Sequence, residues 1–338
     1  MPPVCPPPLH EIRPDGLVLP GCGLWLDARR ARPAGLVSHA HSDHFARHGR
    51  VVCSVPTASL LGARYGLAAD RIDARPFRQP WEEGGHRLEL LPAGHILGSA
   101  MLHATRLADG ASLLYTGDFK LRAGLTAERA EPRPADWLVI ESTFGQPRYR
   151  FPQADGLWDQ VRAWVTATMA ASATPVLMAY SLGKAQEAVA AMAPLGLPVM
   201  AHRSVVALEG AFRTHCPVRL PDLVPLDPDH SAGHVVVVPP NVRHSPQVAA
   251  LPQARFALLT GWALDPSTLY RSKVEAAFPV SDHADFPELL EMVERVAPRQ
   301  VVVVHGFEHD LAAALRARGI DAWSASGGDQ LEFFPLLA

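Results

Sequence analysis

A short polar segment near the start of the chain combines residue types that bind metal ions. Residues 39–44 read His-Ala-His-Ser-Asp-His and follow a short apolar run. Imidazole nitrogen and carboxylate oxygen are ligands suited to zinc. On a tight loop, His39 and His41 can point one way while Asp43 and His44 point another, which would divide them between two metals. A histidine-rich surface loop is the alternative interpretation.

Three further ligand candidates occur singly, after a predicted strand or among small residues. They are His95 in PAGHILGSA, Asp118 in LLYTGDFK and His305 in VVVVHGF. Each alone is weak, because an isolated histidine near glycine is more often structural. Together with residues 39–44 they make five His and two Asp, enough for two four-coordinate metals that share a carboxylate, for which Asp118 is the natural bridge. Two metals about 3.5–4 Å apart would activate a bridging water as the nucleophile and clamp a phosphate during in-line attack.

The surrounding elements predict two kinds of sheet. Residues 16–27 alternate short apolar runs with glycines, as in a hairpin, and several short strands follow, each ending on a polar residue. From about residue 150 the pattern changes to alternating strand and helix, which predicts a parallel sheet in a separate α/β unit. After this unit we expect an amphipathic helix, a buried strand at 301–305 and a last helix at 309–318.

The H-x-H-x-D-H loop and the later single ligands resemble the metallo-β-lactamase fold. This resemblance implies an α/β protein with an αββα sandwich and two zinc ions, with manganese as an alternative metal. Its ligand sets would be His39, His41 and His95 for one ion and Asp43, His44 and His305 for the other, with Asp118 bridging.

Three more motifs resemble the β-CASP nuclease branch, which inserts an α/β domain into the lactamase-like fold. They are ESTFG at Glu141, SDHADF at His283 and VVHGF at His305. In that branch the histidine matching His283 is the proposed general acid, and the acidic residue matching Glu141 orients it. A histidine whose pKa is near neutral can donate a proton at physiological pH. The candidate catalytic residues are therefore His283, Glu141 and Asp43.

The same resemblance predicts how the chain is divided and where substrate binds. The expected parts are residues 1–150 and 266–338 for the lactamase-like domain and 151–265 for the inserted β-CASP domain. Ser181 and Lys184 in the inserted part are candidate phosphate contacts, although a solvated helix position is an equal alternative for Lys184.

Two alternatives concern the residues next to His283 and the inserted part. Asp282 and Asp285 flank His283, and either could orient it or cap the helix that follows; for Asp285 the cap is favoured. His202 and Arg203 stand where the resemblance predicts a His-Gly pair, so the phosphate contact there departs from the β-CASP pattern.

Composition limits the classes of function. Of the 338 residues, 48% are hydrophobic and 19% are charged, which excludes general disorder. The net charge of −3 excludes a globally basic nucleic-acid footprint, while a metal centre supplies its own positive charge. The four cysteines form no C-x-x-C pair, so no thiol redox motif or cysteine zinc site is predicted. Without a leader or an 18-residue apolar stretch, the chain is expected to be soluble and cytoplasmic, with no membrane partner.

Within the branch, the GLVLPGCGLWLDA opening and YRF near residue 150 most resemble the bacterial DNA-ligase-associated exonuclease group. This implies a DNA exonuclease in DNA repair, with a DNA ligase and a helicase as partners. A histidine at 305 is typical of the RNA-processing members, so an RNA-processing endo- or exoribonuclease is the alternative. A small-molecule metallo-hydrolase would not need Glu141 and His283, and a non-catalytic binding subunit would have lost metal ligands.

Overall fold

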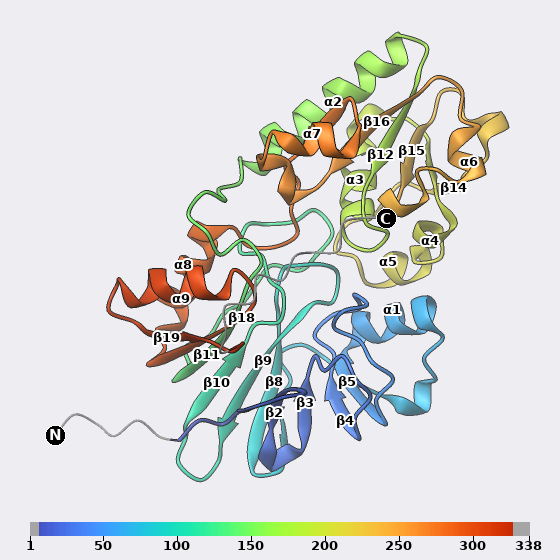
Figure 1. Cartoon of the computed structure of the whole chain (residues 1–338). Helices are drawn as coiled ribbons and strands as arrows, with labels where there is room; N and C mark the ends of the chain where they lie inside the picture. The colour runs from blue at the N-terminus through green and yellow to red at the C-terminus, as the bar shows by residue number, and fades with distance from the viewer. Residues whose placement is uncertain (1–6, 327–338) are drawn as a thin grey trace. The chain divides into compact units, whose positions relative to one another are not determined.

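The computed structural model describes residues 7–326, except the side chains of 154–155, and it divides into two compact units (Figure 1). The first unit contains the residues up to Ala123, Glu128–Arg150 and the segment that starts at His283. The second contains Gly124–Ala127 and Phe151–Asp282. The outer ends of the predicted domains, residues 1–6 and 327–338, lie outside the described residues.

Two sheets build the first unit. One has, in spatial order, β1 (Glu11–Arg13), β2 (Gly16–Leu19), β3 (Leu24–Leu26), β4 (Ala34–Leu36), β5 (Arg50–Ser54) and β6 (Ile72–Arg75). The other has β19 (Asp321–Ser324), β18 (Gln300–Gly306), β11 (Trp137–Ser142), β10 (Ser112–Tyr115), β9 (Ala100–Arg106), β8 (His86–Pro92) and β7 (Trp81–Glu83). Strands β2 and β3 pair antiparallel, which confirms the predicted hairpin.

The two sheets pack face to face, and helices cover their outer faces. Along β11, Trp137 and Val139 enter the core between the sheets, whereas Leu138 and Ile140 enter a second core beneath helices. This is the alternation that a strand buried on both faces must have. The helices are α8 (Phe286–Val296) and α9 (Glu308–Arg316) on this sheet and α1 (Val55–Tyr65) against β5 and β6. These layers confirm the predicted αββα sandwich.

One parallel sheet organises the second unit. Its strands are, in spatial order, β14 (Leu223–Pro225), β13 (Val199–Ala201), β15 (Val235–Val238), β12 (Thr174–Met178), β16 (Ala254–Leu259) and β17 (Ala276–Phe278). All neighbouring pairs are parallel, as the alternating strand and helix pattern predicted. Strand β15 is four valines, all buried, because a parallel strand is covered on both faces.

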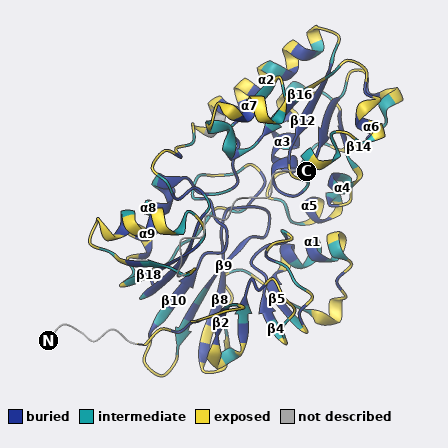
Figure 2. Ribbon diagram, in the orientation of Figure 1, coloured by how far each residue is buried: buried dark blue, intermediate teal, exposed yellow. Residues whose placement is uncertain are grey.

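Helices cover both faces of this sheet. They are α2 (Ala154–Ala170), α3 (Lys184–Met192), α4 (Arg203–Val206), α5 (Glu209–His215), α6 (Pro246–Ala249) and α7 (Ser267–Ser272). Short 3₁₀ turns occur in both units: η1 (Pro20–Cys22) and η2 (Ala69–Arg71) in the first, and η3 (Ala193–Leu195), η4 (Pro228–His230), η5 (Pro240–Val242) and η6 (Gly261–Leu264) in the second. Figure 2 shows buried strands at the centre of each unit and exposed residues on the outer helix faces. No helix within residues 7–326 is both long and apolar enough to cross a membrane.

The second unit extends beyond residue 265, where the sequence pattern places its end. Strand β17 pairs with β16, and Phe278 and Val280 pack into the core of this unit. Because β17 completes the parallel sheet, the chain returns to the first unit only at His283.

Candidate metal centre

The predicted ligands occupy loops and strand ends of the first unit. His39 lies three residues after β4, His95 three residues after β8 and Asp118 three residues after β10. His305 is the penultimate residue of β18. Side chains at such positions are held by a rigid sheet while their polar groups remain free of the strand ladder.

Four of the predicted ligands converge. The Nε2 atoms of His39 and His95 each lie 3.1 Å from Nδ1 of His41. Oδ2 of Asp118 lies 3.5 Å and 3.8 Å from the same Nε2 atoms of His39 and His95. Tetrahedral zinc with Zn–N bonds of about 2.0–2.1 Å places its nitrogens about 3.3 Å apart. The spacing and the chemistry of these four side chains therefore fit a zinc ion.

Of the remaining predicted ligands, His44 lies next to the same carboxylate oxygen, and Asp43 and His305 lie next to His44. Nε2 of His44 is 3.3 Å from Oδ2 of Asp118 and 3.7 Å from Oδ2 of Asp43. The rings of His44 and His305 are 5.7 Å apart, centre to centre. The Asp43 side chain is 62% exposed, so this second set is the more open one. Asp118 is the residue that contacts both sets.

Burial and charge set the protonation of the cluster. Burial lowers the pKa of His39 well below its ordinary value, which leaves a neutral imidazole ready to bind metal. Burial also acts to lower the pKa of His44, but the carboxylates of Asp118 and Asp27 together raise it well above the ordinary value. Burial acts to raise the pKa of Asp118, yet the charges of His44 and His283 bring it well below the ordinary value. His44 and Asp118 thus form a buried ion pair.

Asp27, which the sequence did not single out, holds His44 in place. It ends the apolar run of β3, and its carboxylate accepts hydrogen bonds from the Ser38 backbone (2.7 Å), the Ser38 hydroxyl (2.6 Å), His44 Nδ1 (2.9 Å) and the Tyr115 hydroxyl (2.7 Å). With Nδ1–H bonded to Asp27, His44 presents Nε2 to Asp118. Such outer carboxylates orient metal-binding histidines and raise their basicity. The only sequence signal was a polar residue ending a strand.

His305 sits in a β-bulge at the end of β18. Glu141 pairs with Val304 and Ser142 pairs with Gly306, so His305 is the extra residue. Its φ of 58° is left-handed, which is uncommon for a residue with a side chain. Gly306 follows with φ 77°, and a Cβ there would lie 2.5 Å from the Ser142 carbonyl oxygen. Bulges of this kind re-aim a side chain near functional sites.

Glu141 and His283 form a pair next to the cluster. His283 Nδ1 lies 3.0 Å from Oε2 of Glu141 and 3.9 Å from Oδ2 of Asp118. Glu141 is fully buried and also accepts hydrogen bonds from the Phe119 backbone (2.8 Å) and the Thr143 hydroxyl (2.6 Å). The geometry of the Asp118, Glu141 and His283 side chains also allows them to hold a metal, so a ligand role is the alternative for His283.

The predicted substrate contacts belong to the second unit. The Ser181 hydroxyl lies 2.8 Å from that of Ser204. Lys184 is not a solvated helix residue: it is buried, pairs with Asp282 and lies 5.2 Å from the centre of the Tyr180 ring. Asp282 is therefore engaged by Lys184. In the first unit, Asp285 caps α8 through a hydrogen bond from the Glu288 backbone, which confirms its predicted role.

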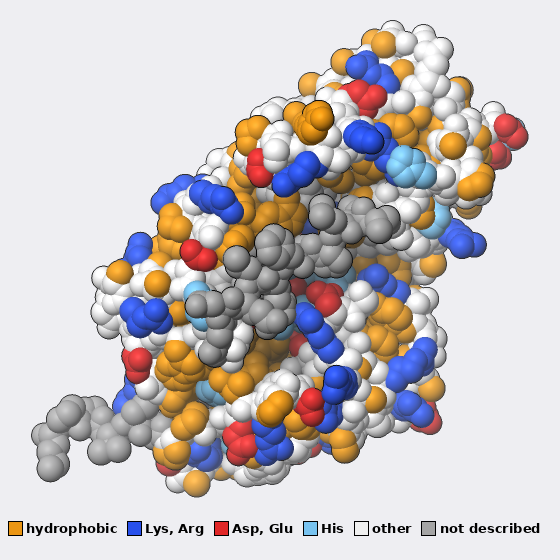
Figure 3. All heavy atoms as spheres, in the orientation of Figure 1, with side chains coloured by type: hydrophobic (Ala, Val, Ile, Leu, Met, Phe, Trp, Pro, Cys, Tyr) orange, Lys and Arg blue, Asp and Glu red, His pale blue; other side chains and the backbone are white. Residues whose placement is uncertain are grey.

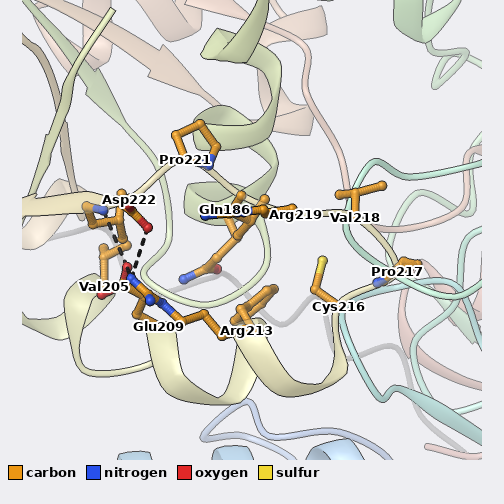
Figure 4. A pocket seen from close by; sticks show the side chains of 13 residues that line it. Gln186, Val205, Glu209, Arg213, Cys216, Pro217, Val218, Arg219, Pro221 and Asp222 are labelled. Atoms are coloured by element: carbon orange, nitrogen blue, oxygen red, sulfur yellow. Dashed lines mark hydrogen bonds and ion pairs between the residues drawn. The ribbon is translucent and has the colours of Figure 1, made fainter.

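The described part of the second unit also contains a cavity of about 400 Å³ (Figure 4). Arg213 beside it pairs with Glu209 and Asp222. Its lining includes none of the predicted site residues, so it does not contribute to the candidate metal centre.

The chain is similar to a family model and to several known proteins. A family model described as the Zn-dependent metallo-hydrolase RNA specificity domain matches residues 273–325. A probable DNA ligase of Opitutus terrae is 42% identical over 319 residues, which cover 94% of this chain and 31% of that protein. The DNA cross-link repair protein SNM1 of Arabidopsis thaliana is 27% identical, over 55% of this chain and 41% of its own length. The RNase J-like protein of Methanocaldococcus jannaschii is 28% identical, over 51% of this chain and 48% of its own length.

The fold and the His/Asp cluster are similar to those of metal-dependent hydrolases with the metallo-β-lactamase fold, in agreement with these relatives. More narrowly, the chain is similar to β-CASP nucleases, among them relatives named for DNA repair and relatives named for RNA processing. The resemblance predicted from the sequence is therefore confirmed. The chain spans less than half the length of each of these three relatives.

Proposed function

We propose that this chain hydrolyses phosphodiester bonds in nucleic acid, as a DNA exonuclease that acts in DNA repair. The observation that carries the proposal is the position of Asp118, whose Oδ2 lies within 3.9 Å of ligand nitrogens of both candidate metal sets and of the candidate general acid His283. Metal ligands and a leaving-group acid around one carboxylate are what a two-metal phosphodiesterase needs.

Each candidate ligand has a proposed place. His39, His41 and His95 would hold one zinc and Asp43, His44 and His305 the other, with Asp118 shared and manganese as an alternative metal. When bound, two such ions polarise a phosphate oxygen and lower the pKa of the attacking water. Asp43, the most open of these carboxylates, is proposed to act in catalysis as well as in binding.

His283 is the proposed general acid. Its Nδ1–H donates to Glu141, so the protonated ring gives up the proton on Nε2 to the leaving oxygen, and the N–H bond breaks as the new O–H bond forms. Glu141 is buried, and its carboxylate lies 3.0 Å from Nδ1 of this ring. Glu141 therefore orients the ring and favours its charged form before the proton is transferred.

The substrate and partners are proposed from the relatives and from the resemblance of the sequence. DNA is favoured because the relative that matches 94% of this chain is named a probable DNA ligase, which also supports a DNA ligase as a partner. A helicase partner and a cytoplasmic location are proposed from the resemblance alone. Ser181 is the proposed phosphate contact of the second unit. Lys184 would join it only by exchanging Asp282 for a phosphate.

RNA processing is the second candidate function. The match to an RNA specificity domain over residues 273–325 favours it, as does the RNase J-like relative. That matched segment includes both His283 and His305, so it covers part of the candidate centre itself.

A cleavage assay separates these functions. End-labelled single-stranded DNA and RNA of the same sequence, with free or blocked ends, are incubated with zinc or manganese, and the Asp118→Ala variant controls for contaminating nucleases. Laddering of DNA from one free end, with RNA spared, is the expected result. Cleavage of RNA instead would move the chain to RNA processing. If neither is cut by protein with its metals bound, the proposed function is wrong.

A further inference from the structure

The candidate general acid His283 is held at its backbone as well as at its ring. Nη2 of Arg122 donates to the main-chain carbonyl oxygen of His283 at 2.8 Å. At the ring, Nδ1 of His283 lies 3.0 Å from Oε2 of Glu141. The direction of the remaining ring nitrogen, Nε2, therefore depends on two contacts, one made by Arg122 and one by Glu141.

Arg122 is itself fixed by Glu288, in the first turn of α8. Nη1 of Arg122 pairs with Oε2 of Glu288, and the Arg122 backbone N–H donates to Oε1 of the same carboxylate. Oε2 also accepts the backbone N–H of Asp285 at 3.1 Å, as part of the reciprocal cap of the helix. Both side chains are mostly buried, with 23% of Arg122 and 11% of Glu288 exposed. A planar guanidinium fixed by a carboxylate in this way holds its other donors in one direction.

A second contact joins the loop of Arg122 to the general acid. This loop begins at Asp118, four residues before Arg122. Phe119 is fully buried; its carbonyl oxygen accepts the backbone N–H of Ala284 at 2.7 Å, and its own N–H donates to Oε1 of Glu141 at 2.8 Å. All of these residues belong to the first unit. The loop that carries the shared carboxylate therefore also fixes the main chain next to the acid and the carboxylate that orients its ring.

Burial distinguishes Arg122 from the basic residues of the molecular surface. On the face drawn in Figure 3, Lys and Arg side chains are scattered among acidic and apolar groups. Arg122 instead directs a donor at the main chain of His283. Without its guanidinium, this carbonyl and the carboxylate of Glu288 would lose a shared partner, so the segment would shift to other partners and the ring would move with it.

We propose that Arg122 is a positioning residue for the general acid: through the main chain of His283, it keeps the Nε2 proton directed at the leaving oxygen. This rests on the proposed nuclease function and adds to it the residue that sets the place of the acid relative to Asp118, whose Oδ2 lies 3.9 Å from Nδ1 of His283. A displacement of about 1 Å in a catalytic group can cost about 10²-fold in rate. Because Arg122 acts through His283, its effect should depend on the presence of that ring.

The test is a double-mutant cycle in the full chain with its metals bound. The variants are Arg122→Gln, His283→Ala and the two changes combined, and kcat is measured on end-labelled single-stranded DNA or RNA, whichever the wild type cleaves. Arg133→Gln is the matched control, because Arg133 pairs with Glu89, a carboxylate of the first unit that is also 11% exposed. Metal content is measured for each variant.

Arg122→Gln should lower kcat on nucleic acid about 10–100-fold. Added to His283→Ala, the same change should lower kcat no further, because an absent ring cannot be misplaced. Arg122→Gln should also cleave thymidine 5′-p-nitrophenyl phosphate within about twofold of the wild-type rate, since p-nitrophenolate leaves without taking up a proton. Arg122→Lys, which keeps a charged donor, should recover part of the loss, and Arg133→Gln should match the wild type on both substrates.

Equal losses on nucleic acid and on the p-nitrophenyl ester would overturn the proposal, because Arg122 would then support the fold and not the acid. A further loss when Arg122→Gln is added to His283→Ala would overturn it too, as would loss of bound metal in Arg122→Gln alone. If the wild type with its metals bound cuts neither substrate, the proposed nuclease function is wrong and this inference falls with it. An active wild type with additive losses refutes this inference alone.

Discussion

Replacing Asp27 by asparagine should weaken metal binding without removing a ligand. One carboxylate oxygen of Asp27 accepts the Ser38 backbone N–H, and the other accepts the Ser38 hydroxyl, His44 Nδ1 and the Tyr115 hydroxyl. An asparagine has one acceptor oxygen and one NH₂ group. Whichever way the amide turns, its NH₂ group faces at least one buried donor, and His44 loses the carboxylate that directs its Nε2 toward Asp118.

Two estimates of the loss agree. A buried donor left without an acceptor costs about 1–3 kcal/mol. Loss of an outer carboxylate from a metal-binding histidine lowers metal affinity about 10–100-fold, which is about 1.4–2.8 kcal/mol. We therefore expect Asp27→Asn to bind zinc roughly 10–100-fold more weakly than the wild type.

Zinc affinity is measured by competition with a chromophoric chelator at constant pH. Asp15→Asn is the matched control, because Asp15 is a carboxylate of the same unit that is 43% exposed and pairs with Arg30 and Arg32 at the surface. Its zinc affinity should equal that of the wild type. Wild-type affinity in Asp27→Asn, or an equal loss in Asp15→Asn, would refute the reasoning about His44.

Three more perturbations test other parts of the molecule. Asp118→Ala should remove metal and hydrolysis together, since its Oδ2 contacts both ligand sets; metal analysis that finds both ions still bound contradicts this. His283→Ala should keep its metals and slow cleavage about 10²–10⁴-fold, and loss of metal would make His283 a ligand. Burial lowers the pKa of His10 to about 4. As the pH decreases from about 6.5 to 4, only the unfolded chain takes up this proton, so the free energy of unfolding decreases as well. The variant His10→Phe keeps a ring against Trp137. Between pH 7 and 5 its free energy of unfolding, measured with urea, should decrease by about 2 kcal/mol less than that of the wild type. Equal decreases in the two proteins would contradict this prediction.

The residues of the candidate centre can be recognised as candidates from the sequence alone, because their signals are local. Residues 39–44 carry their ligand types within one loop, and His305 ends a run of four valines that can only be a buried strand. That strand was expected at 301–305 and is observed at Gln300–Gly306. The sequence signal for the parallel sheet is local as well, because strand and helix alternate along the chain from about residue 150.

Two other elements differ in how much of their signal is local. Helix α1 has an N-cap at Ser54 and a left-handed Gly66 at its end, the usual start and stop of a helix. Strand β17 is three residues of small and aromatic type, too short for its pairing with β16 to be inferred from the chain. The extent of the second unit therefore had to come from the sheet itself.

Sequence determined which side chains were available for metal and acid–base chemistry, because residue type and short spacing belong to the chain. Only the tertiary structure decided which of them meet. His283 reaches Glu141 across 142 positions and Tyr115 reaches Asp27 across 88, while Lys184 is buried against Asp282. These contacts depend on how strands distant in sequence pair and pack. A local pattern does not encode that register, because it is set by the burial of whole sheet faces.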